Sequence, residues 1–298
     1  MQTQSIIEQA DGQTTPDGGA RELRPRIRGM WAAVAPAWGE HAEYLDTRHA
    51  ESTAEMLAAV APKPGEHVLE LACGVGGAGL AAAELVRPGG AVVMSDVVGE
   101  MTAIAATRAA ERGLEHVSTC VLDLERIDQP GASYDIVLCR EGLMFVPDPA
   151  AAARELCRVL RPGGRLALTV WGPRAANPWL ALIFEAVGAR LGRPVPPPGV
   201  PGPFSLEDAG GLAALLRDGG LSNVVVREMA APMRSGSFED WWSKTSSLAG
   251  PLAQILAAMP APSIQALLAD LRERTAPFRR ADGGLEFPGV TLLTTARR

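Results

Sequence analysis

Three Pro-Gly turns that each lead into a short apolar run constrain the fold of this chain most strongly. They stand at Pro64-Gly65, Pro88-Gly89 and Pro162-Gly163. Each follows a stretch with helical spacing, and proline cannot continue a helix, whereas glycine supplies the positive φ that closes one. We therefore expect helices that alternate with strands, which is the pattern of a parallel sheet covered by helices on both faces.

Seven apolar runs are predicted as strands of this α/β fold. Five lie between residues 67 and 171, where strands and helices alternate, and two lie after residue 220. The predicted strands span 67–71, 91–94, 118–122, 134–139, 165–171, 223–227 and 290–295. In such a sheet, ligands bind beyond the carboxyl ends of the strands, so residues at those ends are the candidates for a binding site.

The chain is expected to divide into four parts. Residues 1–26 lack apolar periodicity, which predicts a disordered leader. Residues 27–64 have apolar residues at helical spacing and predict an N-terminal helical cap. The alternating core spans 65–175. Residues 176–298 are predicted to complete the sheet and to contribute two helical insertions, at about 176–204 and 235–285.

Charge and cysteine content exclude several classes of function. The net charge of −6 and the aromatic content of 5% argue against a nucleic-acid-binding surface. No run reaches the roughly 18 apolar residues of a membrane span, and the first 25 residues do not resemble a secretory signal. The four cysteines lack metal-ligand spacing, so no metal site is predicted. We expect a cytoplasmic protein without stable membrane insertion.

A glycine-rich loop follows the first predicted strand. Gly74, Gly76 and Gly79 have the GxGxxG spacing of nucleotide-binding loops and stand between a strand and a helix. The carboxylate of Glu70 is expected to face this loop, where it disfavours a pyrophosphate and favours a cationic ligand. S-adenosylmethionine fits, because it has no phosphate and carries an ammonium and a sulfonium group. The alternative for the glycines is a plain tight turn without a ligand. The alternative for Glu70 is a solvent-exposed residue at a strand end.

Acidic residues also follow the second and third predicted strands. Asp96 can accept hydrogen bonds from both hydroxyls of a ribose, as an acid at this position also does in NAD sites. At Asp123 the carboxylate or an adjacent amide can bind the amino group of adenine. Three apolar neighbours can enclose the adenine ring or belong to the core: Val97, Met101 and Leu124.

The ordered combination of these motifs resembles the class I S-adenosylmethionine-dependent methyltransferases. The matching strings cover about residues 28–175 and are most similar to the branch of the ubiquinone/menaquinone C-methyltransferases. They are Val68-Leu-Glu-Leu-Ala-Cys-Gly-Val-Gly76, Ser95-Asp96 with Glu100-Met101, Asp123, and Val159-Leu-Arg-Pro-Gly-Gly164. The resemblance implies a Rossmann-like, seven-stranded, mostly parallel sheet with a helical substrate cover formed by the segments after Trp171.

The same resemblance implies which residues contact the cofactor, S-adenosyl-L-methionine. It implies a ribose contact for Asp96, adenine contacts for Asp123 and Leu124, and a place beside the cofactor for Cys139. The implied contacts to the methionine part come from the glycine loop: Glu70, Ala72, Cys73, Gly74 and Gly76.

Candidate catalytic residues follow the fourth predicted strand. Arg140 and Glu141 are expected to face the substrate, with Glu141 as a general base if the acceptor must lose a proton. An ordinary acid at a helix start is the alternative for Glu141. His41, in the cap, is a second candidate base or a surface residue, whereas His49 is expected at the surface.

Three aromatic residues are candidate walls of the substrate pocket. Trp38 and Tyr44 belong to the cap and either close the site or pack in the core. Trp241 opens the late helical insertion and is predicted to line an apolar pocket.

The leading prediction is an enzyme that moves a methyl group from S-adenosyl-L-methionine to an oxygen or carbon of a small, apolar or aromatic metabolite of natural-product type, with S-adenosyl-L-homocysteine as product. The alternatives are a quinone-ring C-methyltransferase, a protein that binds the cofactor but acts as a scaffold or catalyses cyclisation, and an NAD-dependent oxidoreductase. A monomer or homodimer is expected.

Overall fold

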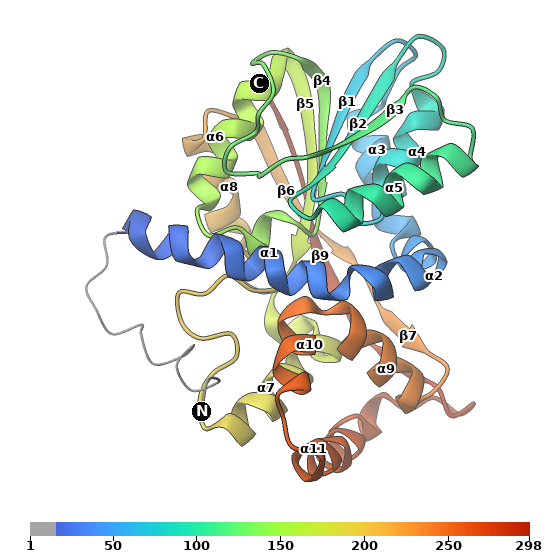
Figure 1. Ribbon diagram of the computed structural model, residues 1–298, viewed down its shortest axis with the longest axis vertical. Helices are drawn as coiled ribbons and strands as arrows, with labels where there is room; N and C mark the ends of the chain where they lie inside the picture. The colour runs from blue at the N-terminus through green and yellow to red at the C-terminus, as the bar shows by residue number, and fades with distance from the viewer. Residues whose placement is uncertain (1–15) are drawn as a thin grey trace.

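A seven-stranded sheet forms the centre of the computed structural model, which describes residues 16–298 (Figure 1). The strand order is β3-β2-β1-β4-β5-β9-β6. Strands β1 to β5 pair in parallel, and β9 is antiparallel to both of its neighbours. The strands are β1 (His67–Leu71), β2 (Ala91–Asp96), β3 (Val117–Val121), β4 (Tyr134–Arg140), β5 (Leu160–Trp171), β6 (Ser222–Ala230) and β9 (Val290–Arg297). The predicted α/β fold with a mostly parallel seven-stranded sheet is confirmed.

Helices cover both faces of the sheet, because the central strands are apolar on both sides. In β1, Val68 packs into one core, whereas Leu69 and Leu71 pack into the other, as the alternation of a strand requires. One face is covered by α3 (Ala50–Val60), α4 (Gly77–Leu85) and α5 (Gly99–Glu111), the other by α6 (Pro149–Val159) and α8 (Ala209–Asp218). As expected for a helix start, the carboxylate of Asp148 caps α6 by accepting from the amide of Ala151.

A second layer of helices forms a cover below the sheet in Figure 1. The long helix α1 (Pro16–Glu40) crosses between the sheet and this cover and packs on α5, α9 and α10. The other parts are α2 (Ala42–Arg48), α7 (Pro178–Leu191), α9 (Phe238–Leu248), α10 (Gly250–Ala257), α11 (Ala261–Arg274), the short 3-10 helices η1 (Leu143–Phe145), η2 (Arg174–Ala176) and η3 (Ala276–Phe278), and the two-stranded sheet of β7 (Met233–Ser235) and β8 (Leu285–Phe287).

Two expectations about local structure are corrected. Part of the leader predicted over 1–26 is helical, since residues 16–26 belong to α1; residues 1–15 lie outside the described residues. This part of the helix was not predicted because it carries no apolar stripe; a tertiary ion pair links Arg24 to Glu125, which follows β3. Strand β5 begins at Leu160, five residues earlier than predicted, and an irregularity in its pairing with β4 accommodates the Pro-Gly turn.

Strands β7 and β8 were not expected. Each has three residues, which is too short to produce a visible alternation, and about 50 residues separate them in the sequence. None of the helices formed by residues 16–298 has both the length and the apolar character to cross a bilayer.

Candidate active site

One cavity opens at the carboxyl ends of the central strands and extends beneath α1 and α2. The strand order reverses between β1 and β4, and in open α/β sheets ligands bind at such a point. The cavity measures about 210 Å³, far more than the roughly 15 Å³ that one ordered water requires by the same measure. Its walls therefore define the site, with strand-end residues on one side and cover residues on the other.

The carboxylate of Glu70 closes the start of helix α4. Its Oε2 accepts a hydrogen bond from the backbone amide of Gly79 at 2.8 Å, and the side chain is buried at the cavity wall. Burial raises the pKa of Glu70 to about 7, although Arg140 and the amides of Gly79 and Ala78 oppose the shift. The amide that a diphosphate would need at this helix start is thus already used by an acid.

The glycines of the loop have different tasks. Gly74 lines the cavity with φ of +51°, and its amide donates to Asp96 at 2.9 Å. Gly76 does not line the cavity, and its cofactor contact stays a prediction. A Cβ there would lie 3.1 Å from Met94 Sδ, so the glycine permits close packing of helix on strand. At Gly79 a Cβ would lie 2.4 Å from Glu70 Oε2. Only glycine leaves room for the carboxylate of Glu70 at this position.

The carboxylate of Asp96 is held rigidly at the cavity wall. One oxygen accepts from the Gly74 amide and the other from the Val98 amide at 3.0 Å. Burial raises the pKa of Asp96 despite these hydrogen bonds. Each oxygen keeps a further lone pair for a ligand hydroxyl.

All four residues predicted to surround an adenine ring lie on this same wall. They follow β2 and β3, whose carboxyl ends are adjacent in the sheet. They are Val97, Met101, Asp123 and Leu124, and each lines the cavity.

Two strained residues lie side by side where the strand order reverses. Ala72 and Glu141 directly follow the paired ends of β1 and β4 and have φ of +50° and +56°. Gly142 makes this approach possible, since a Cβ there would lie 2.3 Å from the Cβ of Ala72. Backbone strain of this kind concentrates at functional sites, where it aims side chains that a relaxed turn would place elsewhere.

Cys139 is a core residue and does not reach the cavity, contrary to the predicted place beside the cofactor. Its side chain is fully buried, and burial raises the pKa of its thiol to about 12. A Cβ at Gly142 would lie 3.1 Å from this sulfur, and Gly142 itself lines the cavity whereas Cys139 does not. Cys73, in contrast, does line the cavity as predicted.

Glu141 and His49 form a buried pair in the cavity wall. His49 Nε2 lies 3.1 Å from Glu141 Oε2, and His49 Nδ1 lies 2.8 Å from the carbonyl oxygen of Leu45. The carbonyl can only accept, so Nδ1 carries a proton and Nε2 is the basic nitrogen. Burial lowers the pKa of His49. Burial would raise the pKa of Glu141, but His49, Arg140 and Arg48 outweigh it and lower it. With Nδ1 protonated, a hydrogen bond across the 3.1 Å contact needs one further proton, shared between Nε2 and Oε2, so the pair has one site for a proton.

The expectations for the two cap histidines are reversed by the structure. His41 and His49 flank helix α2 at its two ends, and His49 lines the cavity whereas His41 does not. The C-terminal end of α2 lies at the cavity, so His49, which was expected at the surface, is in the site. The role of His41 as a base stays a prediction that its position does not support.

The cover side of the cavity is walled by aromatic rings. Trp171, at the end of β5, meets Trp179 of α7 edge to face at 5.1 Å between ring centroids. The guanidinium of Arg48 lies 4.5 Å from the Trp179 centroid, and its Nη1 lies 2.9 Å from Met233 Sδ. Tyr44 lines the same wall as predicted, with Lys244 Nζ 4.4 Å from the centre of its ring.

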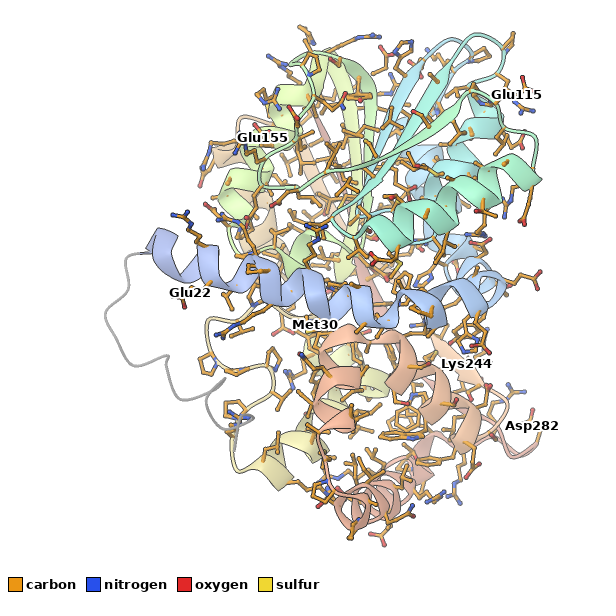
Figure 2. The ribbon with its side chains drawn as sticks, viewed as in Figure 1. Glu22, Met30, Glu115, Glu155, Lys244 and Asp282 are labelled. Carbon is orange, nitrogen blue, oxygen red and sulfur yellow. The ribbon has the colours of Figure 1, made fainter. Side chains whose placement is uncertain are left out.

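Trp241 does not line the cavity, which corrects its prediction as a substrate contact. It is fully buried between Phe238 and Phe287, and its Nε1 donates to the Trp179 carbonyl oxygen. Helix α9 presents Lys244, among others, to the cavity instead. Figure 2 shows Lys244 beside the C-terminal part of α1.

Specific contacts fasten α1 and α2 over the strand ends. Trp38 lines the cavity as expected: its Nε1 donates to the Leu248 carbonyl at 2.8 Å, and its ring lies over Gly74. Asp46 of α2 pairs with Arg108 and Arg112 of α5. The cap and the cover therefore meet directly above the glycine loop.

Arg140 lines the cavity as predicted, but on the side of the glycine loop. Its Nη1 donates to the Thr53 hydroxyl at 2.8 Å, and its charge opposes the upward pKa shift of Glu70. A Cβ at Gly77 would lie 2.9 Å from Arg140 Nη2. Its position is thus at the end of the cavity that holds Glu70.

Sequence reasoning did not select three important cavity residues: Arg48, Trp171 and Trp179. Two tryptophans at and shortly after the end of the fifth strand are a visible signal in a chain that has six tryptophans, whereas no pattern distinguishes Arg48, the last residue of α2. Trp171 and Trp179 are eight residues apart in the sequence, but Arg48 lies on α2 more than 100 residues before them. No spacing in the sequence therefore predicts that the three residues meet.

Comparisons with known proteins agree with this geometry. Residues 68–164 match the family model of a methyltransferase domain. Nocamycin O-methyltransferase of Saccharothrix syringae is 40% identical over 114 residues, which cover 38% of this chain and 41% of that protein. Ubiquinone biosynthesis O-methyltransferase of Xanthomonas campestris pv. campestris is 32% identical over 165 residues, which cover 54% of this chain and 67% of that protein.

The crystal structure of the YcgJ protein from Bacillus subtilis shares the fold, with a TM-score of 0.61 and 20% identity over 84% of this chain and 99% of that one. The chain belongs to the S-adenosyl-L-methionine-dependent methyltransferase family, as the motifs predicted. It spans less than half the length of nocamycin O-methyltransferase, so the similarity is concentrated in the core.

The strand-end half of the cavity fits S-adenosyl-L-methionine, the cofactor of this family. The acid at the start of α4 takes the place of a phosphate and leaves negative charge for a cationic ligand. Asp96 offers free lone pairs at the wall, and apolar residues after β2 and β3 surround the adjoining space. The site therefore suits a nucleoside with a positive charge and no phosphate.

Proposed function

We propose that this protein transfers a methyl group from S-adenosyl-L-methionine to an oxygen of a small aromatic or apolar metabolite. The observation that carries the proposal is that one cavity is lined by the strand-end residues, by the aromatic rings of Trp171 and Trp179, and by the Glu141–His49 pair. Two relatives are O-methyltransferases, which supports an oxygen acceptor, whereas a third is a ubiquinone/menaquinone C-methyltransferase and supports the carbon alternative.

Residues of the strand ends would hold the cofactor. Asp96 would accept the ribose hydroxyls, and Val97, Met101 and Leu124 would enclose the adenine, with Asp123 near its amino group. Glu70 and Arg140 would set the charge around the methionine part, with Ala72, Cys73 and Gly74 close by. When bound, the cofactor supplies an electrophilic methyl group on a sulfonium.

The Glu141–His49 pair would remove the acceptor's proton. Nδ1 of His49 is committed to Leu45, so a proton taken by the pair is shared between Nε2 and Glu141 Oε2. The nearby Arg140 and Arg48 keep the carboxylate ionised and thus ready to accept. General-base assistance of this kind contributes roughly 10² to 10⁴ in rate.

The cover would orient the acceptor and exclude water. Trp171, Trp179 and Tyr44 provide flat apolar surfaces, which suit an aromatic ring. Trp38 and the cap close the cavity over the glycine loop, so that solvent does not compete with the acceptor. The free state of the four cysteines supports a reducing, cytoplasmic setting, and we propose a monomer or homodimer.

The first experiment measures binding of S-adenosyl-L-methionine and of NAD by calorimetry. We expect binding of the sulfonium compound alone, weakened by about 1–3 kcal/mol in Asp96→Ala. Binding of NAD without binding of S-adenosyl-L-methionine would identify an oxidoreductase and end the proposal.

The second experiment follows release of S-adenosyl-L-homocysteine with a panel of phenols, aromatic acids and quinols. Release with an oxygen acceptor supports the proposal, and methylation of a ring carbon supports the quinone alternative. A substrate that is cyclised without any release of S-adenosyl-L-homocysteine would support the third alternative, a cofactor-binding cyclase.

A further inference from the structure

Arg48 carries an unused hydrogen-bond donor at the acceptor end of the cavity. Among the described residues, its buried Nη2 has no hydrogen-bond partner, and the partner of its Nη1 is the sulfur of Met233, which is a weak acceptor. The guanidinium lies between Trp171 and Trp179, at 5.4 and 4.5 Å from their ring centroids. Within residues 21–298, no carboxylate pairs with it at salt-bridge distance.

A second polar group in the same cavity is also without a partner. Thr245 of α9 lines the cavity, and its buried Oγ1 makes no hydrogen bond within the described part of the chain. Buried polar groups in native proteins are nearly always hydrogen-bonded, because an unmade hydrogen bond costs roughly 1–3 kcal/mol. Arg48 of α2 and Thr245 of α9 thus line the same cavity, and each has a buried polar atom that a ligand could bind.

The other charges of the cavity do not satisfy Arg48. Glu141 is near enough to interact electrostatically with it, but this carboxylate pairs with His49. Lys244 is itself a cation and is already paired with Asp240 at 2.6 Å. The guanidinium of Arg48 therefore keeps an unused donor beside flat aromatic walls, with no carboxylate of the described residues at salt-bridge distance.

We propose that Arg48 and Thr245 form a subsite for an anionic oxygen of the acceptor, a carboxylate or an ionised enol or phenol attached to a planar ring. The ring would pack on Trp171 and Trp179 while the anionic oxygen takes the Nη2 donor. A charge-assisted hydrogen bond in a partly dry cavity is among the strongest available, which makes this contact a determinant of specificity. This inference rests on the proposed function, because it names the substrate class of the same site.

The test measures binding of three planar acids, benzoate, 1-naphthoate and 2-naphthoate, against the matching neutral amides in the presence of S-adenosyl-L-homocysteine. We expect the wild-type protein to bind at least one acid about tenfold more tightly than its amide. 1-Naphthol and 2-naphthol, titrated across their ionisation, distinguish an ionised phenol from a carboxylate. Binding of S-adenosyl-L-homocysteine is measured first, because its absence contradicts the proposed function and not the subsite.

Three variants assign the preference to Arg48. Arg48→Met should abolish the roughly tenfold preference for the acid over its amide and leave cofactor binding unchanged. Arg48→Lys should retain part of that preference. Lys244→Met is the matched control, since it removes one cation from the same cavity and should retain the preference. Far-UV circular dichroism establishes that each variant is folded. If the wild type binds none of the acids, or Arg48→Met and Arg48→Lys both keep the full preference, the subsite is wrong.

Discussion

Glu70 Oε2 lies 2.8 Å from the backbone nitrogen of Gly79, so the first acid of the glycine loop is a cap of helix α4. Sequence reasoning placed this carboxylate opposite a cationic ligand. The structure gives it a second task, because it occupies the helix start at which a diphosphate would bind. One buried acid thereby excludes dinucleotides and favours a sulfonium nucleoside.

The burial of Glu70 predicts a pH-dependent stability. Its pKa is about 7 in the folded chain and 4.5 as an ordinary value. Because the folded pKa is the higher one, its stabilising contribution is complete below about pH 4.5 and is lost as pH rises through 7. Glu70→Gln should therefore raise the free energy of unfolding at pH 8 by on the order of 3 kcal/mol, and by much less at pH 5.5. Urea unfolding of the wild type and the variant at pH 8 and pH 5.5 measures this difference. An equal change in the free energy of unfolding at the two pH values would contradict the raised pKa of Glu70.

The same group predicts that cofactor affinity rises with pH. A cationic ligand prefers ionised Glu70, so binding should strengthen as pH rises through about 7 and should release a proton. Calorimetry in two buffers of different ionisation enthalpy measures that proton. In Glu70→Gln the dependence should flatten and the affinity should fall by about 1–3 kcal/mol. A wild-type affinity that is constant from pH 6 to pH 8 would remove Glu70 from the binding site.

Loss of the Glu141 carboxylate should affect turnover without affecting cofactor binding. Glu141→Gln is expected to lower kcat by roughly 10² to 10⁴ and to leave the Kd of S-adenosyl-L-methionine within about twofold. Its pKa is lowered from 4.5, so activity limited by this base should fall only below about pH 4.5. The exposed Glu84, replaced by Gln, is the control and should change neither quantity. Full activity of Glu141→Gln with its substrate would show that no base is needed there.

A methyl group at Gly79 should disturb both helix and cofactor site. The added Cβ of Gly79→Ala would lie 2.4 Å from Glu70 Oε2 and 2.6 Å from Met94 Cγ, so we expect a loss of about 1–3 kcal/mol in stability and weaker cofactor binding. The matched control is Gly99→Ala in the first turn of α5, where the nearest atom, Val121 Cγ2, is 3.7 Å away. That variant should be neutral or slightly more stable. Equal losses of stability in Gly79→Ala and Gly99→Ala would argue against the close approach of Gly79 to Glu70.

The contact between Trp38 and Leu248 should control how long the cofactor stays bound. Trp38→Phe keeps a ring over Gly74 but loses the 2.8 Å hydrogen bond that joins α1 to α9. We expect faster release of S-adenosyl-L-homocysteine, by several-fold, measured by stopped-flow fluorescence. Trp242→Phe, on the same helix as Leu248 but outside the cavity wall, is the control. No change in the release rate of Trp38→Phe would show that the cap does not retain the ligand.

The sequence by itself determined the sheet and the cofactor wall. Glu70, Asp96 and Asp123 each stand at or just after the end of a strand whose apolar run is visible in the sequence. Parallel strands bring their carboxyl ends to one edge, so the position of each acid follows from local pattern and topology alone. For the same reason Glu141, after the fourth strand, was correctly placed in the cavity.

Only the tertiary structure decided which cap and cover residues enter the site. His41 and His49 flank one short helix, which contacts α5 through the ion pair of Asp46 with Arg108, and only His49 lines the cavity. Likewise, the docking of α9 turns Trp241 into the core and Lys244 into the cavity. Helical spacing tells which residues share a face, but the direction of that face depends on partners that are distant in the sequence, and no local pattern encodes them.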